Sequence, residues 1–266
     1  MDATTIAAEL AALNETAALA PPFSGREPRP SAATAAAAAR KLHQHRLAGG
    51  WRPLGRKIGF TNRTIWPRYG VFEPIWGFVY DRTLIEAANG RAVVPLAGLA
   101  QPRIEPEIAF RLKAAPAGAD TASLLASIES VAHAVEIVQC HHPGWKLGLA
   151  DSIADNGLHG RLVLGAPVPA QALGDLAARL PAATVALSRD GALIERGSGA
   201  NVLGSPLAAL AWLVEALARD AEAPALGAGD WVSTGTLTDA HPVAAGERWT
   251  TSFEGLALPG LEIVFA

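Results

Sequence analysis

Three glutamates in β-like runs have the residue type and spacing for metal chemistry. Glu105 and Glu107 stand two apart in QPRIEPEIAF, and Glu136 interrupts the apolar run HAVEIVQC. Because successive strand side chains point to opposite faces, Glu105 and Glu107 share one face. The other face is apolar: Ile104, Ile108 and Phe110. Carboxylates this close repel one another unless a cation lies between them, and an isolated buried carboxylate is costly.

The ion that such a cluster would hold follows from its ligands. Three carboxylates from two strands suit a hard divalent ion such as Mg²⁺ or Mn²⁺, which prefers oxygen ligands, and they suit zinc poorly. A simpler interpretation of Glu105 and Glu107 alone is a solvated edge strand whose charge discourages aggregation. Glu136, in an otherwise apolar run, favours the metal site.

Two helices precede the β-like runs. In the first, apolar residues recur at helical spacing: Ile6, Leu10, Leu13 and Ala17. It stops before Pro21, and Ser31 can cap an alanine-rich second helix that ends before Gly49. We therefore expect residues 1–50 to form a small helical N-terminal arm, whose apolar surface is available for an expected homo-oligomer.

Residues 51–266 have the sequence pattern of a mostly β domain. Short apolar runs are separated by Gly and Pro: RKIGF, WGFVYD, RAVVP, IEPEIAFRL, AVEIVQC and RLVLGAPV. Two segments are predicted as helices, SLLASIESVAH and SPLAALAWLVEALARD, and Asp190-Gly191 marks a hairpin turn. The pattern predicts an α+β fold with one catalytic body behind the arm.

Composition limits the classes of partner. The chain has 266 residues, of which 50% are hydrophobic and 18% charged, with a net charge of -3. We therefore expect a small-molecule partner and no nucleic acid or anionic membrane. The longest apolar stretch, PLAALAWLVEALA, is shorter than the roughly 20 residues of a membrane span. A single cysteine, Cys140, and an N-terminus without signal-peptide features predict a cytoplasmic protein.

Several ordered motifs together resemble one family. PRIEPEIAF, HAVEIVQC, GWKLGLADSIADNGLHG, GRKIGF and STGTLTDAHPV are similar to the 2-keto-4-pentenoate hydratase branch of the fumarylacetoacetate hydrolase superfamily. The resemblance implies a twisted mixed β-roll or β-sandwich that holds a divalent metal. It also implies that Glu105, Glu107 and Glu136 are the metal ligands.

The resemblance further implies a 2-oxo acid substrate, which chelates a metal through its carboxylate and 2-oxygen. The expected reaction is that of a hydro-lyase in aromatic catabolism: water adds to a 2-hydroxy-2,4-dienoate, or 2-keto-4-enoate, to give a 4-hydroxy-2-oxo acid. An acylpyruvate-type C–C hydrolase or a 4-oxalocrotonate-like decarboxylase on the same fold is the alternative. A non-catalytic binding protein is a further class, against which the intact glutamates and Lys57 argue.

Candidate catalytic residues come from two further motifs. Lys57 in GRKIGF matches the family's lysine, and Asp81 in WGFVYD matches an acidic residue after a glycine turn. We expect the two to form an acid/base or water-orienting pair, with a structural salt bridge as the alternative. Thr236 in STGT matches a hydroxyl position that lines the family's pocket.

The chain departs from the family after Asn156, an expected substrate contact. The hydratases are expected to continue with Ala and two Ser, whereas Gly157, Leu158 and His159 follow here. An aromatic-rich stretch ends at Phe78, another expected substrate contact, and suggests a larger substrate tail, with core packing as the alternative. Its other aromatic residues are Trp66, Tyr69, Phe72 and Trp76.

The run Cys140-His141-His142 invites a nucleophile or zinc interpretation. Neighbouring strand residues face opposite sides, so the two histidines are poorly placed to share one ion. We expect Cys140 to be a small buried hydrophobic residue.

Overall fold

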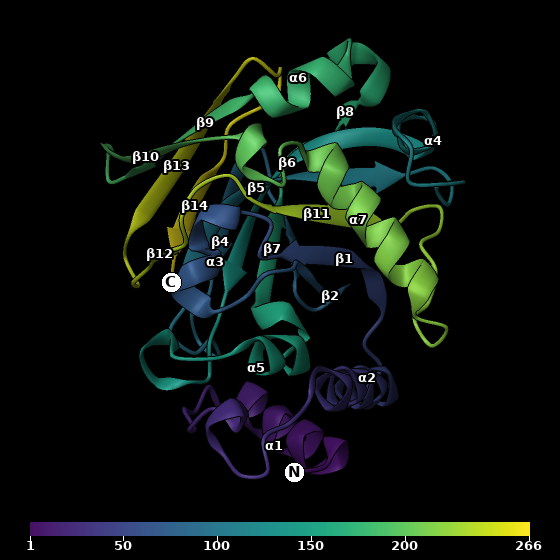
Figure 1. Ribbon diagram of the computed structural model, residues 1–266. Coiled ribbons are helices and arrows are strands. Elements are labelled where there is room, and N and C mark those ends of the chain that lie inside the picture. The colour runs from purple at the N-terminus through teal and green to yellow at the C-terminus, as the bar shows by residue number, and fades with distance from the viewer.

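The predicted strands form two sheets (Figure 1). The computed structural model describes residues 1–266, except for the side chains of Arg68 and Tyr69. Over this backbone, one sheet has nine strands and the other has five. An apolar cluster joins the sheets, with Val135 from the larger sheet and Leu187 and Trp249 from the smaller one. The α+β prediction, a mixed β-roll with a helical N-terminal arm, is confirmed.

The larger sheet positions the predicted glutamates. In spatial order its strands are β2 (Ile75–Tyr80), β1 (Pro53–Gly59), β11 (Trp231–Thr236), β5 (Arg103–Leu112), β6 (Ile128–Val138), β7 (His159–Leu164) and β3 (Leu84–Glu86). Two short strands extend it, β12 (His241–Pro242) beside β5 and β8 (Val168–Pro169) beside β6. The β1–β11 and β3–β7 pairs are parallel, and the other pairs are antiparallel.

The smaller sheet backs the larger one. Its strands are β10 (Ala192–Ser198), β9 (Thr184–Arg189), β13 (Arg248–Glu254), β14 (Glu262–Phe265) and β4 (Arg91–Val94). Strands β9 and β10 form the predicted hairpin, and Asp190 and Gly191 in its turn both have positive φ. Such a backbone conformation is accessible to Gly and Asp, which explains their place between the strands.

Seven α-helices complete the described backbone: α1 (Ala3–Thr16), α2 (Ala32–Ala48), α3 (Trp66–Tyr69), α4 (Thr121–Ser127), α5 (Leu149–Ala154), α6 (Leu176–Ala182) and α7 (Pro206–Arg219). The segment Gly199–Arg219 is long and apolar enough, by length and composition, to cross a membrane. Within it, however, α7 has 14 residues, and its apolar stripe is buried against the larger sheet. Ser205 caps the start of α7.

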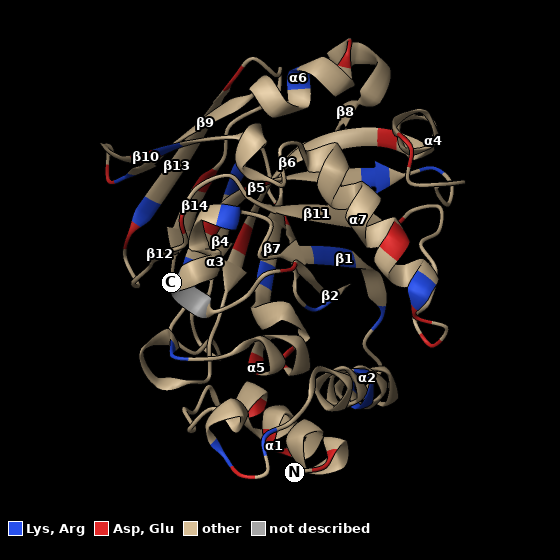
Figure 2. Ribbon diagram, in the orientation of Figure 1, with Lys and Arg blue, Asp and Glu red and all other residues tan. Residues whose placement is uncertain are grey.

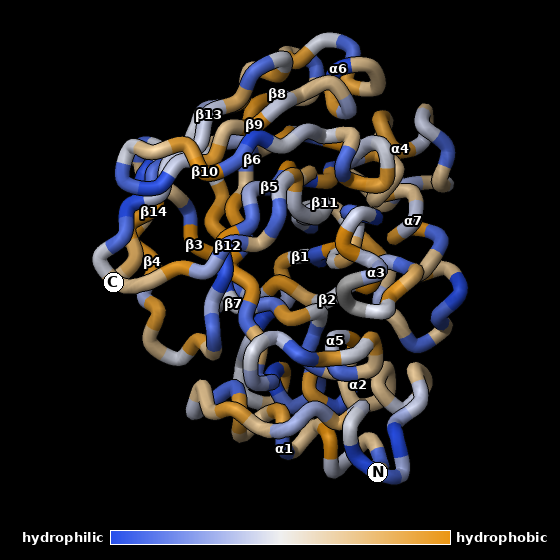
Figure 3. Tube along the Cα trace, turned by 60° about the vertical axis from the view of Figure 1, so that its left-hand side comes forward, coloured by the Kyte–Doolittle hydropathy of each residue, from blue (hydrophilic) through white to orange (hydrophobic). Residues whose placement is uncertain are grey.

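The N-terminal arm packs on the body through α5. Asp2 and Ser31 cap α1 and α2 with their side chains, as the sequence predicts for Ser31. The apolar faces of α1 and α2 meet α5 in one cluster, to which Ile6, Leu10 and Ala154 belong. Figure 3 shows hydrophobic and hydrophilic segments alternating along α1, as expected for an amphipathic helix. The division into an arm of residues 1–50 and a body of 51–266 stays a prediction.

One predicted helix is half strand. The segment SLLASIESVAH was predicted to be helical, but α4 ends at Ser127 and β6 begins at Ile128. β-Branched side chains such as Ile128 and Val131 favour a pleated surface. Pairing of β6 with β5 along almost its whole length then outweighs the local helix propensity.

Candidate active site and metal centre

Glu105, Glu107 and Glu136 converge in the structure. A carboxylate oxygen from each lies within 4.8 Å of the others. The strand register explains the cluster, because Glu105 lies directly opposite Glu136 across the β5–β6 ladder. Glu107 follows two residues later on the same face of β5. Ile104, on the opposite face, is fully buried, as predicted.

The oxygens of the cluster are held unequally. Glu107 Oε2 accepts hydrogen bonds from Ser233 Oγ at 2.5 Å and from the backbone N–H of Gly235 at 2.9 Å. Its other oxygen, Oε1, is buried and has no hydrogen-bond partner among the described residues. Glu136 Oε1 lies 2.7 Å from His159 Nδ1. An unpaired buried carboxylate oxygen beside two further carboxylates is the donor set that Mg²⁺ or Mn²⁺ prefers, so these residues fit a divalent ion.

The charges of the cluster are poorly balanced by protein groups alone. Burial, with the neighbouring Glu136 carboxylate next in importance, raises the pKa of both Glu105 and Glu107 to about 8. Burial also raises the pKa of Glu136, against the opposing effect of Lys57. Three carboxylates therefore share one ammonium, and a divalent cation would favour the charged form of all three.

Lys57 is the cation of this cluster. Its Nζ lies 3.0 Å from Glu136 Oε2 and donates to the carbonyl oxygen of Gly157 at 2.8 Å. Burial opposes its charge, but the carboxylates of Glu136, Glu105 and Glu107 outweigh burial and raise the pKa of Lys57. Strands β1 and β6 are three places apart, which is ~14 Å in a flat sheet. Because the sheet curls, inward side chains from these strands converge.

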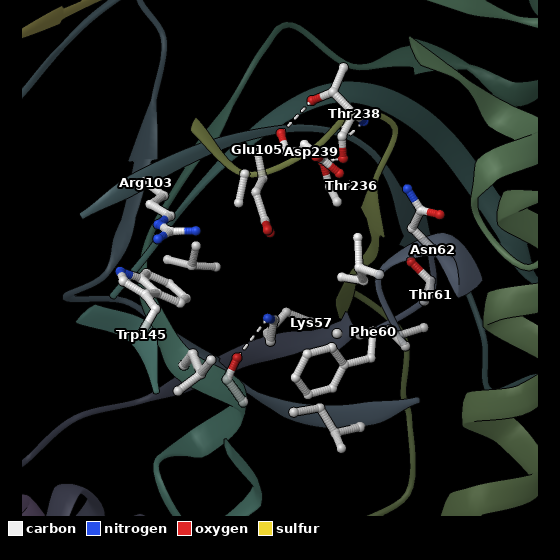
Figure 4. A pocket seen from close by; sticks show the side chains of 18 residues that line it. Lys57, Phe60, Thr61, Asn62, Arg103, Glu105, Trp145, Thr236, Thr238 and Asp239 are labelled. Carbon is white, nitrogen blue, oxygen red and sulfur yellow. Dashed lines mark hydrogen bonds between the residues drawn. The ribbon is translucent and has the colours of Figure 1, made fainter. Parts of the chain in front are cut away.

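Lys57 and Glu105 face a pocket from opposite sides (Figure 4). The Arg103 guanidinium lies over the Trp145 ring, 4.2 Å from its centroid, on a third side. Thr236 also lines the pocket, as predicted, and its hydroxyl donates to the carbonyl of Thr238. The remaining polar lining side chains are Thr61, Asn62, Thr238 and Asp239, and the larger apolar ones are Ile58, Phe60, Ile65, Ile75, Val138 and Leu158.

The predicted pairing of Lys57 with Asp81 is absent. Asp81 forms an ion pair with Arg52 at 3.0 Å and also accepts from the backbone N–H of Arg52. The antiparallel register of β1 and β2 explains the difference, since Lys57 lies opposite Gly77. Asp81 follows the last residue of β2, four residues further along, at the end of the strand pair where Arg52 lies. Hydrogen bonds from Arg52 lower the pKa of Asp81.

Phe78 and Asn156 support the site from behind. Asn156 accepts from the backbone N–H of Phe78 and donates to its carbonyl, which attaches the Gly157 turn to β2. The Phe78 ring stacks on His43 at 3.6 Å. The described lining of the pocket includes neither side chain, and it also lacks Trp66, Phe72 and Trp76. The Tyr69 side chain lies outside the described residues. The aromatic side chains that line the pocket are Phe60 and Trp145.

Several contributors to the site had no strong signal in the sequence. Ser233 and Gly235 hold Glu107 by hydrogen bonds. The signal available in the sequence was that both belong to STGT, the motif that ends at the predicted Thr236. His159, noted as a departure from the family, holds Glu136. Arg103 lies two residues before Glu105 and so shares its face of β5.

The fold and the site define a family, and comparison with known proteins agrees. Residues 71–258 match the family described as "Fumarylacetoacetate (FAA) hydrolase C-terminal". The match covers more than half of the chain, which therefore belongs to the fumarylacetoacetate hydrolase family.

Curated relatives lie in its hydratase branch. The chain is 37% identical over 220 residues to 2-hydroxyhexa-2,4-dienoate hydratase of Comamonas testosteroni, covering 81% of this chain and 80% of the relative. It is 36% identical over 214 residues to 2-keto-4-pentenoate hydratase of Paraburkholderia phymatum, covering 79% and 78% of the two chains.

A solved structure is similar over almost the whole chain. This is 4-oxalocrotonate decarboxylase from Pseudomonas putida G7, complexed with magnesium and adipate, with a TM-score of 0.89 and 26% identity. The similarity covers 99% of this chain and 97% of that one. The same decarboxylase has also been solved with calcium and acetate. These complexes and the glutamate cluster support a divalent metal at this site.

Proposed function

We propose that this protein is a metal-dependent hydratase of aromatic catabolism. It adds water to a 2-hydroxy-2,4-dienoate, or 2-keto-4-enoate, and forms a 4-hydroxy-2-oxo acid. A cluster of three glutamates beside a buried lysine, of which Glu105 and Lys57 line one pocket, carries this proposal. The hydratase relatives, at 36% and 37% identity, support it.

Glu105, Glu107 and Glu136 would hold the metal, for which we propose Mg²⁺, with Mn²⁺ as the alternative. When bound, the ion supplies a Lewis acid that orients a 2-oxo acid and stabilises negative charge on its 2-oxygen. The protein's part is to fix the ligands before the ion arrives. Ser233 and Gly235 orient Glu107, and His159 orients Glu136.

Lys57 is the proposed proton-handling residue. An ammonium has three N–H donors; Lys57 donates one to the Gly157 carbonyl and lies in an ion pair with Glu136. A further N–H is left for a group in the pocket, which Lys57 lines. We propose that it orients the attacking water or donates a proton to the substrate chain. Asp81, which pairs with Arg52, is left out of this proposal.

Arg103 and Thr236 are the proposed substrate contacts. A guanidinium binds a carboxylate through two parallel hydrogen bonds, and stacking on Trp145 limits the orientations that Arg103 can adopt. Thr236 adds a polar wall nearby. Apolar side chains such as Phe60 and Leu158 offer room for the substrate tail, whose length stays a prediction.

A decarboxylase of the 4-oxalocrotonate type is the second candidate. The similarity to such an enzyme over 99% of the chain favours it, and Arg103 could hold the second carboxylate of a dicarboxylic substrate. The identity to this structure is 26%, however, against 37% for a hydratase relative. Hydration is therefore the first candidate reaction.

The experiment incubates purified protein and Mg²⁺ with 2-hydroxypenta-2,4-dienoate, a longer dienoate, an acylpyruvate and 4-oxalocrotonate. Mass spectrometry distinguishes gain of water, C–C cleavage and loss of CO₂. We expect gain of water by a dienoate, abolished by EDTA and restored by Mg²⁺. Loss of CO₂ from 4-oxalocrotonate without hydration would favour the second candidate, and turnover of none of the four would contradict both.

The cellular setting is part of the same proposal. Cys140 is buried and unpaired, in keeping with a reducing cytoplasm. The homo-oligomer predicted from the N-terminal helices stays a prediction, which sedimentation analysis would test.

A further inference from the structure

A second cavity lies where the N-terminal arm meets the body. Its volume is about 410 Å³, within the range of small-molecule sites. Its walls come from α1, from the end of α2 and from the segments around Trp51, Arg82 and Arg161. Figure 2 shows basic residues on α2, and Figure 1 shows this helix below the strands of the body.

Three arginines line this cavity without an acidic partner. Arg46 donates to Asn14 Oδ1 at 3.3 Å, Arg82 to the carbonyl oxygen of Gly49 at 3.0 Å, and Arg161 to that of Gly160 at 2.9 Å. These acceptors are all neutral, and among the described side chains no carboxylate forms an ion pair with any of the three guanidinium groups.

Burial makes this arrangement costly. Arg46 is only 8% exposed and burial lowers the pKa of Arg161, whereas Arg82 is exposed. A desolvated cation needs a compensating charge or an electron-rich partner. Aromatic rings compensate in part, since Arg46 and Arg82 lie 5.4 Å and 5.5 Å from the centroid of Trp51. They add no negative charge.

Other titratable groups at the cavity leave the excess of positive charge in place. His45 and Glu15 both line it and are exposed. Glu15 pairs with none of the three guanidinium groups. The buried Asp155 carboxylate accepts from Asn14 at 3.0 Å and lies near enough to Arg46 for the two charges to interact. Two carboxylates therefore oppose three guanidinium groups, and an anionic ligand would balance the remainder.

We propose that this cavity binds a small oxyanion of the phosphate or polycarboxylate type. Arg46, buried and fixed by Asn14 and Trp51, forms the floor of the site. Arg82 and Arg161 supply further guanidinium forks, whose paired N–H groups match the oxygens of either anion.

The site shares residues with the support of the metal centre. His159 and Thr83 line this cavity, and His159 Nε2 lies 2.8 Å from Thr83 Oγ1. The other ring nitrogen of His159 faces Glu136. A bound anion would therefore touch the residues that orient one proposed metal ligand. The binding proposal itself is independent of which reaction the metal centre performs.

The test is isothermal titration calorimetry of the full chain with Mg²⁺ present. Inorganic phosphate and succinate are titrated in separate arms, each against sodium chloride at equal ionic strength. We expect saturable binding of at least one of them, and the tighter arm identifies the class. Arg82→Gln and Arg161→Gln should each weaken that binding at least tenfold. Arg196→Gln, which removes the same charge from the exposed strand β10, should leave it unchanged.

Circular dichroism and the thermal midpoint first establish that each variant is folded. Arg161→Lys, which keeps the charge but loses the fork, gives a second measurement and should bind with intermediate affinity. Absence of saturable binding in both arms would overturn the proposal. Binding that pyruvate displaces and that both glutamine variants retain would place the anion in the active-site pocket and would overturn it equally.

Discussion

Lys57 Nζ lies 3.0 Å from Glu136 Oε2, and the two side chains are 2% and 0% exposed. Such a buried pair is costly to form and more costly to break. Hydrogen bonds on both sides hold the pair in place: Lys57 donates to the Gly157 carbonyl, and the Glu136 carboxylate is bonded to His159. The pair therefore connects the Gly157 turn, strand β1 and strand β6 beside the pocket that Lys57 lines.

Replacing Lys57 by Met should lower kcat at least ~100-fold, the size expected for loss of a proton-handling group. The affinity for Mg²⁺ should not fall, because Lys57 is not a proposed ligand and its charge repels the ion. Steady-state kinetics and calorimetry measure the two effects. Lys113→Met, at an exposed lysine, is the control. A Lys57→Met enzyme with near wild-type kcat would refute the assignment.

Glu107→Gln should weaken Mg²⁺ binding strongly and abolish metal-dependent turnover. Ser233→Ala removes one hydrogen bond to Glu107 and should weaken binding by about 10–100-fold, typical of a lost supporting contact. Calorimetric titration with Mg²⁺ gives both values, and Glu129→Gln is the exposed control. Full turnover by Glu107→Gln without bound metal would contradict the metal site.

Asp81→Asn should change kcat less than about threefold, because Asp81 pairs with the exposed Arg52 away from the pocket and such pairs contribute little. Kinetics under saturating Mg²⁺ measure the effect, with Lys57→Met assayed in parallel. A loss as large as that of Lys57→Met would restore the pairing predicted from the sequence.

Gly77→Ala should lower both stability and kcat. A Cβ at Gly77 would lie 2.2 Å from the carbonyl oxygen of Asn156, so the Gly157 turn that holds Lys57 would have to shift. Overpacking of this kind costs about 1–3 kcal/mol. Thermal unfolding and kinetics measure it. Gly227→Ala, where a Cβ meets no atom within 4 Å, is the matched control. Equal stability and equal kcat of the two variants would show that the Gly157 turn shifts at no cost and would contradict this prediction.

His43 should contribute a loss of stability as the pH falls from about 6.5 towards 4. Burial, followed by the charges of Arg56 and Arg46, lowers the pKa of His43 to about 4. Above pH ~6.5 this histidine is neutral in the folded and unfolded states. Below it the unfolded state binds the extra proton, so folding is disfavoured.

The thermal midpoint measured at several pH values tests this contribution. His43→Phe can still stack on Phe78 and should show a smaller fall than the wild type between pH 7 and 5. His45→Phe, at an exposed neighbour, is the control. Identical pH profiles for His43→Phe and the wild type would exclude the contribution.

The glutamate cluster could be predicted because its causes are local. Alternation along one strand places Glu105 and Glu107 on one face, and the cost of burying Glu136 calls for a nearby cation. The caps of α2 and α7 are equally local, since Ser31 and Ser205 lie next to the helices they cap.

Other features depended on the register between strands and on the curl of the sheet. In the β1–β2 register Lys57 lies opposite Gly77 and not beside Asp81, and in the β5–β6 register Glu105 lies opposite Glu136. Strand pairing also makes β6 a strand from Ile128 onward, although the local sequence there favours a helix.

The sequence by itself determined which side chains could hold a divalent ion, because residue type and strand alternation are properties of single segments. Only the tertiary structure decided which partners these side chains have. Three contacts show this: Lys57 with Glu136, Ser233 with Glu107, and His159 with Glu136. Each joins two different strands, and the paired residues lie 23 to 126 positions apart in the chain. Such contacts form when distant strands pair and the sheet closes around one pocket, which no local pattern encodes.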